Sequence, residues 1–557
     1  MNLDFMPLFV LLAPAAFLFT ALISWFQPGL KPWAVKKAGI ASSIFSILIA
    51  ASSGFFVVQY GLLESPLLGM SEIGFSVRLD SLSILMFSMI AILGFIVVRF
   101  SLNYLDGDER QGRFIGRLAA TIAAVQLLVL AGNLGLLLVS WILTSISLHR
   151  LLVFYKNRPG AIIAARKKFL VARIADACLL TAVLLLYFQF ETGNLEVIFQ
   201  AIKQSLSVGI FPTNLEAAAL LLALAALFKS AQFPTHGWLI EVMETPTPVS
   251  ALLHAGLLNA GPFLLIRMAF VMEASTYASI LIIIVGAFTA LFASIAFLTQ
   301  TSIKTALGYS SVAHMGFSLL ICGLGVYPAA MLHLIAHSFY KAHSFLSSGS
   351  VIDVIRASKI KKSKRTGSLI RIALGFVMAM AVYMGFAFVW GIDLVHDFSL
   401  LAIGGIIVMG LSTIFTSALD SDSNRKVELV FRATILAIIV SAAFFILESG
   451  THHLLAAQLP AITRLSFVEI LLISFVIFAF GVVVFVQIIA PALPAKPFYR
   501  ILAIHFRNGF YANALFDRIV KALRIDSVTA HARAVEKIEI MRRYEPIETE
   551  RFEEQTA

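Results

Sequence analysis

Cysteine and charged residues are both scarce in this sequence of 557 residues. Only two cysteines are present, Cys178 and Cys322, and each lies within an apolar run. Two separate thiols cannot supply the ligands of an iron–sulfur cluster, and they lack the paired spacing of a zinc site. We therefore expect no metal or other cofactor in this chain, and we assign any redox centre or zinc chemistry to a partner.

The shortage of charge points to a membrane protein. Charged residues make up 13% of the chain and hydrophobic residues 59%, whereas a soluble domain is about a quarter charged. Apolar runs recur along almost the whole length, and each can cross a ~30 Å hydrocarbon layer as a helix. Lipid offers no partner to an unpaired backbone amide, so helices are expected. The sequence predicts an all-α polytopic membrane protein with about 15 transmembrane helices of roughly 20 residues each.

The formal net charge of +11 is concentrated in three basic stretches. Positive charge marks the cytoplasmic side of membrane proteins, so this bias explains the charge without nucleic-acid binding. Followed along the spans, it places the C-terminus in the cytoplasm and the N-terminus on the opposite, periplasmic side. The basic residues are Lys31, Lys36 and Lys37; Lys156, Arg158, Arg166, Lys167 and Lys168; and Arg356, Lys359, Lys361, Lys362, Lys364, Arg365 and Arg371.

One span, at residues 215–243, is too long for a single straight crossing. It contains Lys229 near its middle, followed by Pro234 and Gly237. Proline removes a backbone hydrogen bond and clashes with the preceding turn, so a break near Gln232–His236 is expected. Broken helices occur in membranes where the freed backbone faces protein or a water-filled cavity.

Lys229 is the clearest functional candidate, because an ionisable residue at the bilayer centre costs ~2.5 kcal/mol or more. Desolvation favours neutral lysine, so Lys229 can release and regain a proton near neutral pH. Asp176, in the span at 168–190, is its candidate partner, either in a structural ion pair or in a movable pair that gates a proton. Glu241 and Glu244 flank the break; they either admit protons from the cytoplasm or only solvate a loop.

A second group of candidates lies on a later span. His333, His337 and Lys341 recur every fourth residue, so they share one helix face. Histidine titrates near neutrality, and such a row can relay protons through intervening water. The alternatives are structural hydrogen bonds or a zinc site, for which no further ligand is evident. Three residues extend this path: His254, which can link Lys229 to the row, His314, and Lys304, which either contributes or only reaches to the interface.

The composition changes again after Pro497. From Arg507 to Arg543, charged residues alternate with spaced apolar ones. This pattern predicts an amphipathic cytoplasmic tail, which either lies on the membrane or docks a soluble partner.

The segment Lys229-Ser-Ala-Gln-Phe-Pro-Thr-His-Gly-Trp-Leu, with the following Thr245-Pro-Thr-Pro-Val-Ser-Ala-Leu-Leu-His254-Ala, resembles the antiporter-like membrane subunits of respiratory complex I and of Mrp antiporters, the NuoL/MrpA family. The resemblance implies two inverted five-helix repeats with broken helices and a central lysine and histidine axis that carries protons or sodium. It implies the following division: N-terminal helices at 1–110, a first repeat at 111–272, a second repeat at 273–420, C-terminal helices at 421–495, and the tail at 496–557.

Two departures separate the chain from redox-pump subunits of that family. Ser140-Trp141-Ile142-Leu143 lacks the glutamate of the usual Gly-Trp-Glu-Gly, and Met384 to Asp393 lacks the prolines and charge of the second broken helix. Glu241-Val-Met-Glu-Thr-Pro-Thr-Pro is instead similar to DabB, the family of membrane subunits of DAB inorganic-carbon uptake complexes.

The DabB resemblance implies a non-enzymatic subunit in which downhill cation flow, of protons or of sodium, powers CO₂ hydration to bicarbonate. Catalysis then belongs to a zinc-binding cytoplasmic partner similar to DabA and to carbonic anhydrase. The rival hypothesis is a subunit of an NADH-quinone oxidoreductase or of a sodium/proton antiporter.

Overall fold

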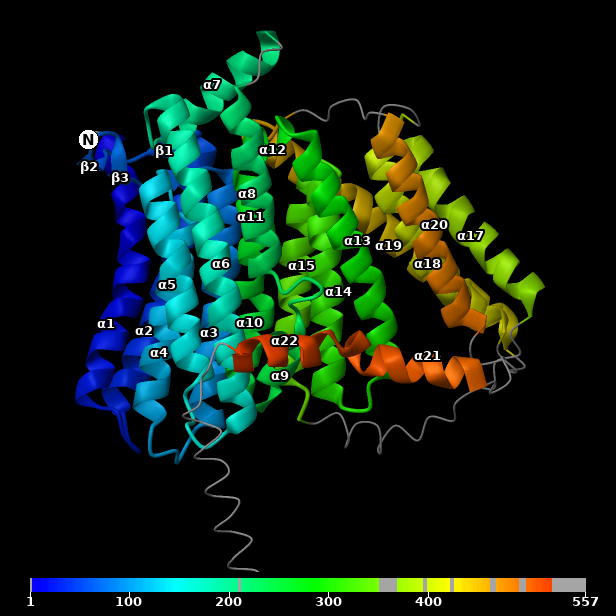
Figure 1. The fold of residues 1–557 in the computed structure, drawn as a ribbon, viewed down its shortest axis with the longest axis horizontal. Coiled ribbons are helices and arrows are strands. Elements are labelled where there is room, and N and C mark those ends of the chain that lie inside the picture. Colours follow the sequence, from blue (N-terminus) through cyan, green and yellow to red (C-terminus); the bar gives the residue numbers. More distant parts are fainter. Residues whose placement is uncertain are drawn as a thin grey trace, which may run out of the picture.

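The structure is a computed structural model that describes residues 3–208, 212–349, 368–393, 398–420, 425–460, 467–489 and 497–522. Its helices stand side by side in one elongated bundle (Figure 1). Within the described part, 13 helices are long and apolar enough to cross a membrane, which confirms the polytopic all-α class. Two further predicted spans coincide with α8 (Thr213–Lys229) and α15 (Tyr327–Leu346). The total of 15 and the inverted repeats stay predictions.

The remaining helices follow one another with short connections. The first half contains α1 (Leu12–Phe26), α2 (Trp33–Tyr60), α3 (Ser81–Tyr104), α4 (Gln111–Val129), α5 (Leu134–Leu152), α6 (Pro159–Phe190), α7 (Leu195–Val208) and α9 (Gly237–Glu241). The second half contains α10 (Thr247–Ala255), α11 (Ala260–Arg267), α12 (Ala269–Glu273), α13 (Thr276–Thr299), α14 (Ile303–Gly323), α17 (Leu369–Val389), α18 (Phe398–Leu419), α19 (Lys426–Leu455), α20 (Phe467–Ile489), α21 (Pro497–Arg507) and α22 (Ala512–Ala522). Turns of 3₁₀ helix occupy Leu3–Leu11, Val242–Glu244, Leu257–Asn259 and Gly509–Tyr511.

Four short strands between α2 and α3 were not predicted. They form two antiparallel pairs, β1 (Leu63–Glu64) with β4 (Arg78–Leu79) and β2 (Leu68–Met70) with β3 (Ile73–Phe75). The register of the first pair places Glu64 opposite Arg78. These strands therefore hold a charged cluster at the end of the bundle from which α3 starts.

The stretch where the resemblance implies a second broken helix, Met384–Asp393, contains the end of α17. α17 is continuous from Leu369 to Val389. Together with α18 and α19 it forms a separate apolar cluster centred on Tyr383, Phe415 and Phe445. The part of Met384–Asp393 that lies in α17 contains no proline, so its helical hydrogen bonds are intact, and the helix ends at Val389 before Gly391, whose φ is 70°.

The described part of the tail is helical and lies across one face of the bundle, where α21 and α22 cross in front of the other helices (Figure 1). Phe506 and Phe510 pack on Phe292 of α13, with ring centroids 6.2 and 5.8 Å apart. Phe510 has φ 50°, so the chain turns sharply between the two helices. The rest of the predicted tail, 523–557, lies outside the described residues.

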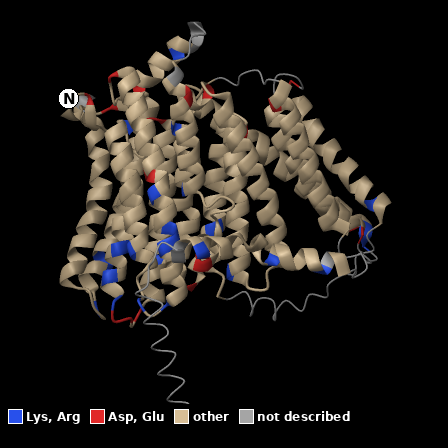
Figure 2. Cartoon of the chain, viewed as in Figure 1, with Lys and Arg blue, Asp and Glu red and all other residues tan. Residues whose placement is uncertain are grey.

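Lysine and arginine gather toward the end of the bundle where α21 and α22 lie (Figure 2). Most of the predicted basic stretch from Arg356 to Arg371 lies outside the described residues. One expectation is wrong: Lys167 and Lys168 are not loop residues, because α6 begins at Pro159 and buries both, with exposed fractions of 0% and 5%. Because both are buried in the helix bundle, their role is not limited to marking the cytoplasmic side of the membrane.

Candidate functional site

Lys229 is the last residue of α8 and precedes the break in the predicted broken helix. The segment from Ser230 to His236 is non-helical, and α9 starts at Gly237. The break thus begins two residues earlier than the sequence predicted. Ala231 within it has φ 51°, in the left-handed region. The chain ends one helix at Lys229 and starts another at a displaced position, which leaves the lysine side chain at the centre of the bundle.

The ammonium group of Lys229 is held by α5 rather than by a carboxylate. Its Nζ donates to the carbonyl oxygen of Trp141 at 3.0 Å, to Thr144 Oγ1 at 3.2 Å and to Ser145 Oγ at 2.7 Å. The ammonium also lies over the indole of Trp141, 4.1 Å from the ring centroid. The oxygen dipoles and the aromatic face stabilise the ammonium less strongly than a full negative charge would. The site can therefore hold Lys229 in either protonation state.

Asp176 does not form the predicted ion pair with Lys229. Its carboxylate pairs instead with Arg173, three residues earlier on α6, at 2.5 Å. Among the residues that the structure describes, no carboxylate oxygen lies within 4.0 Å of the Lys229 ammonium. The structural ion-pair interpretation is thus wrong for this conformation, whereas a movable pair stays a prediction.

The predicted row on α15 is present and is joined by His314 from α14. The His314 ring lies 5.3 Å from that of His333 and 4.9 Å from that of His337, measured between centroids. Lys341 donates to Ser310 Oγ at 2.7 Å. No group of three or more His, Cys, Asp or Glu in the described ranges is arranged to hold a metal ion. Three imidazoles and one ammonium therefore form a nitrogen-rich cluster, which we call the histidine cluster.

His254 is fully buried in α10, and its ring stacks on Phe345 of α15 with centroids 4.3 Å apart. Neither of its ring nitrogens has a hydrogen-bond partner among the described residues, and the same holds for His337. His254 thus stands against the helix that carries the histidine cluster. Lys304, by contrast, is half-buried at the start of α14, where its Nζ lies 3.4 Å from Thr247 Oγ1.

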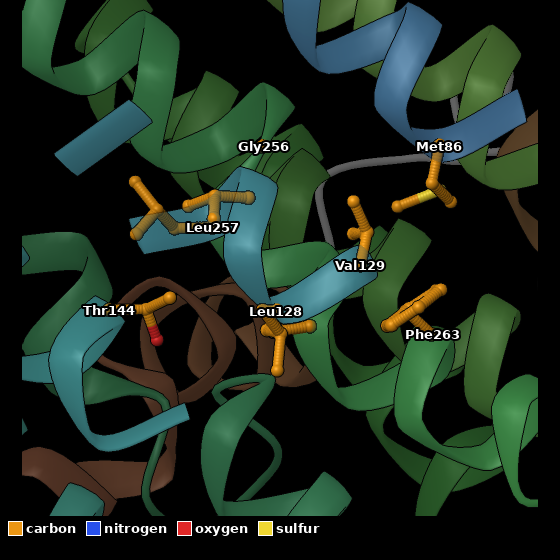
Figure 3. Close-up of a pocket in the computed structure, with 9 residues that line it drawn as sticks. Met86, Leu128, Val129, Thr144, Gly256, Leu257 and Phe263 are labelled. Carbon is orange, nitrogen blue, oxygen red and sulfur yellow. The ribbon is translucent and has the colours of Figure 1, made fainter. Parts of the chain in front are cut away.

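A small cavity is lined by residues from α3, α4, α5 and the segment that follows α10, among them Thr144 and Gly256 (Figure 3). Its volume is about 10 Å³, close to the space of one water molecule. Thr144 provides the polar side chain of the lining, and this hydroxyl is one of the groups that hold Lys229. Gly256, where α10 is interrupted, also lines the cavity. The other lining residues are Met86, Val125, Leu128, Val129, Leu257, Ala260 and Phe263.

Glu241 lies at the end of α9 in a network with the tail. Both of its carboxylate oxygens accept from Lys167 Nζ at 2.7 Å, and Asn513 donates to it at 2.5 Å. Lys167 also pairs with Asp517 of α22 at 2.5 Å. We call Lys167, Glu241, Asn513 and Asp517 the tail network. Glu244 nearby accepts from the backbone N–H of Ala161 at 3.1 Å.

Reversing the charge of Asp517 should release α22 from the bundle. In Asp517→Lys, two ammonium groups face each other across a buried site, which disfavours the docked helix. We expect faster amide hydrogen exchange over 497–522, measured by mass spectrometry. Ala514→Lys is the control, because it places the same ammonium group at an exposed position of α22 and leaves the ion pair intact. Equal exchange in the two variants would show that the ion pair does not hold the tail.

A second buried charged group lies where α3 begins. Arg267 of α11 forms a two-pronged contact with the carboxylate of Asp80, at 2.5 and 3.2 Å, and Arg78 contacts the same carboxylate at 2.7 Å. Arg78 also pairs with Glu64 at 2.9 Å and with Glu196 at 2.7 Å. Asp80 is fully buried, so this cluster fastens the first strands, α3 and α11 together.

The sequence did not reveal the groups that hold Lys229. Trp141, Thr144 and Ser145 lie three and four residues apart, so they share one face of α5. This spacing was available as a signal, but small hydroxyl residues in a membrane helix commonly bond to their own backbone. Only the approach of α8 shows that this face contacts the lysine.

Comparison with known proteins defines the class. A family model described as "NADH:quinone oxidoreductase/Mrp antiporter, TM" matches residues 131–392, and one described as "NADH-Ubiquinone oxidoreductase (complex I), chain 5 N-terminus" matches 68–115. The first range contains the broken helix, His254 and the histidine cluster. These two stretches of the chain are therefore similar to antiporter-like membrane subunits.

Within that class the chain belongs to the DabB family of inorganic carbon transporter subunits. It is 35% identical over 483 residues to "Probable inorganic carbon transporter subunit DabB2" of Halothiobacillus neapolitanus, an alignment that covers 85% of each chain. It is 40% identical over 325 residues to the DabB protein of Hydrogenovibrio crunogenus, covering 58% of this chain and 61% of that one. NADH-quinone oxidoreductase subunit L of Escherichia coli is 36% identical over 322 residues, covering 56% and 52%.

Solved structures agree on the fold. A chain of the Mrp complex from Dietzia sp. superposes with a TM-score of 0.60 at 22% identity, covering 96% of this chain and 62% of that one. A chain of respiratory complex I from Thermus thermophilus superposes with a TM-score of 0.53 at 19% identity, covering 90% and 99%.

Proposed function

We propose that this chain is the proton-conducting subunit of an energy-coupled inorganic carbon uptake complex in the bacterial inner membrane. Downhill proton flow through it powers CO₂ hydration to bicarbonate in a partner. The observation that carries the proposal is the Lys229 site, where a lysine at a helix break is held by oxygen dipoles and an indole face. Such a lysine can change its protonation state without leaving an unpaired carboxylate behind.

The proposed path continues from Lys229 toward α15. The cavity beside Thr144, whose other lining side chains are apolar, lies next to the interruption of α10 at Gly256. His254 then stands against the helix of the histidine cluster, whose members are His314, His333, His337 and Lys341. Glu241 and Glu244 are the proposed entrance for protons from the cytoplasm. Asp176 is the proposed negative charge that attracts a proton to Lys229. Lys304 adds positive charge beside α10.

The proposed cation is the proton rather than sodium. The described side chains along the path are lysine ammonium and imidazole groups, which exchange protons and repel or poorly bind Na⁺. Hard alkali and alkaline-earth cations need several oxygen ligands in one shell. The oxygens of Trp141, Thr144 and Ser145 are already occupied by the Lys229 ammonium.

The proposed partner is a zinc-binding, carbonic-anhydrase-like cytoplasmic chain of the DabA type, so this chain is not itself the enzyme. Support comes from the membership in the DabB family and from the docked tail, which presents α21 and α22 across the same face as the entrance carboxylate Glu241. The tail (496–557) is the proposed docking region, with the C-terminus in the cytoplasm and the N-terminus in the periplasm.

Purification of the tagged chain in mild detergent tests the proposed partnership. We expect a soluble chain to co-purify in near-stoichiometric amount and to contain zinc, measured by mass spectrometry and elemental analysis. Quinone-reductase or Mrp subunits in its place would return this chain to the rival class. The continuous α17 and the absence of a carboxylate partner for Lys229 among the described residues argue against that class.

A further inference from the structure

Lys168 is a buried lysine that the path above does not use. It lies on α6, and its Nζ donates to the carbonyl oxygen of Ser145 at 2.8 Å. No carboxylate in the described part of the chain lies within 4.0 Å of this ammonium. A lysine in an apolar bundle is retained at a cost, so its position calls for a function.

Lys168 and Lys229 converge on the same residue from two different helices. Ser145 accepts Lys168 at its carbonyl oxygen and Lys229 at its hydroxyl, at 2.8 and 2.7 Å. Two ammonium ions this close in an apolar interior repel each other strongly. The state with one of the two lysines charged is therefore far more favourable than the state with both charged. The two side chains titrate as a coupled pair.

The other charged groups around Lys168 relieve this repulsion only in part. Arg173 adds to the positive side, whereas Asp176, which is paired with Arg173 at 2.5 Å, attracts both ammonium groups. The preceding residue, Lys167, belongs to the tail network and contacts Glu241. Lys167 thus belongs to the tail network, and the next residue of α6, Lys168, contacts the Lys229 site.

We propose that Lys168 is a proton-carrying residue that delivers protons from the side of the tail network to Lys229. The Lys168 ammonium gives up one proton and becomes an amine, while the Lys229 amine accepts one proton and becomes an ammonium. Ser145 lies against both lysines, with its carbonyl oxygen accepting from Lys168 and its hydroxyl from Lys229, and no electrons are transferred. This inference rests on the proposed proton conduction and adds a residue to it.

Substitution of Lys168 in the whole complex, reconstituted in proteoliposomes, tests the inference by proton flux at several pH values. Lys168→Met should lower the flux at pH 7 about tenfold or more, as expected for loss of a proton-transferring group. Lys168→Arg should be equally impaired, because arginine keeps the charge and the hydrogen bond but does not release its proton. Lys156→Met, at an exposed loop position, is the matched control.

The arginine variant separates proton transfer from a structural role. If Lys168→Arg restores wild-type flux and an unchanged pH profile, Lys168 only supports Ser145 and the inference is overturned; this holds even where the methionine variant fails to assemble. If Lys229→Met abolishes flux while both Lys168 variants retain it, the inference fails and the proposed function survives. If Lys229→Met retains flux, both fail.

Discussion

Replacing Lys229 by methionine should reduce proton flux through the assembled complex by roughly 100-fold or more, the effect of removing a group that transfers a proton. Methionine retains most of the side-chain length and its apolar stem, so the packing against Trp141 is largely preserved. What is lost is the ammonium that Thr144 and Ser145 hold at the helix break. Flux is measured with a pH-sensitive dye trapped in proteoliposomes under an imposed proton gradient.

Two comparisons make this result specific. Lys156→Met removes a positive charge from an exposed loop and should leave the flux unchanged. Ser145→Ala removes one of the three oxygens around the Lys229 ammonium and should have an intermediate effect, because a hydrogen bond to a charged group contributes about 1.5–3 kcal/mol. Wild-type flux in Lys229→Met, at equal amounts of assembled complex, would remove Lys229 from the path.

Replacing Arg267 by alanine should destabilise the chain by about 3–5 kcal/mol, the usual effect of breaking a buried ion pair on one side. Arg267 supplies two hydrogen bonds to Asp80 and one to Ser83. Without it, Arg78 alone would face the carboxylates of Asp80, Glu64 and Glu196. The change is measured as a lower midpoint of denaturant-induced unfolding in detergent.

The double variant Asp80→Asn with Arg267→Met shows why Arg267→Ala loses stability. It separates the loss of the attraction between Arg267 and Asp80 from the cost of leaving the Asp80 charge buried without its partner. Because it removes both charges, it should be more stable than Arg267→Ala alone. Flux per assembled complex should be unchanged in either variant, since this cluster lies outside the proposed path. An Arg267→Ala chain with wild-type stability would show that Arg78 alone balances the cluster.

Features that depend on local sequence were predicted well. Long apolar runs define helices regardless of their neighbours, because lipid demands internal hydrogen bonds. Pro234 marks the break after Lys229 to within two residues, since proline acts on the turn that contains it. The spacing of His333, His337 and Lys341 fixed their common helix face in the same way.

Features that depend on contacts between distant segments could not be predicted. Lys167 and Lys168 looked like loop residues because they belong to a stretch with five basic positions, yet α6 begins at Pro159, before the apolar run, and buries both. The partner of Lys167 lies 350 residues later, in α22. Asp176 looked like the partner of Lys229, but an arginine on its own helix competes for it. No pattern within a single span contains this information.

The most direct test of the account is bicarbonate accumulation in sealed vesicles that contain the intact complex, followed with labelled CO₂ under imposed ion gradients. The account predicts accumulation while protons flow from the periplasmic to the cytoplasmic side, its loss on addition of a protonophore, and no accumulation with a sodium gradient alone. Accumulation that persists after the proton gradient is collapsed, or that follows sodium, would contradict the central claim that proton flow through this chain powers carbon uptake.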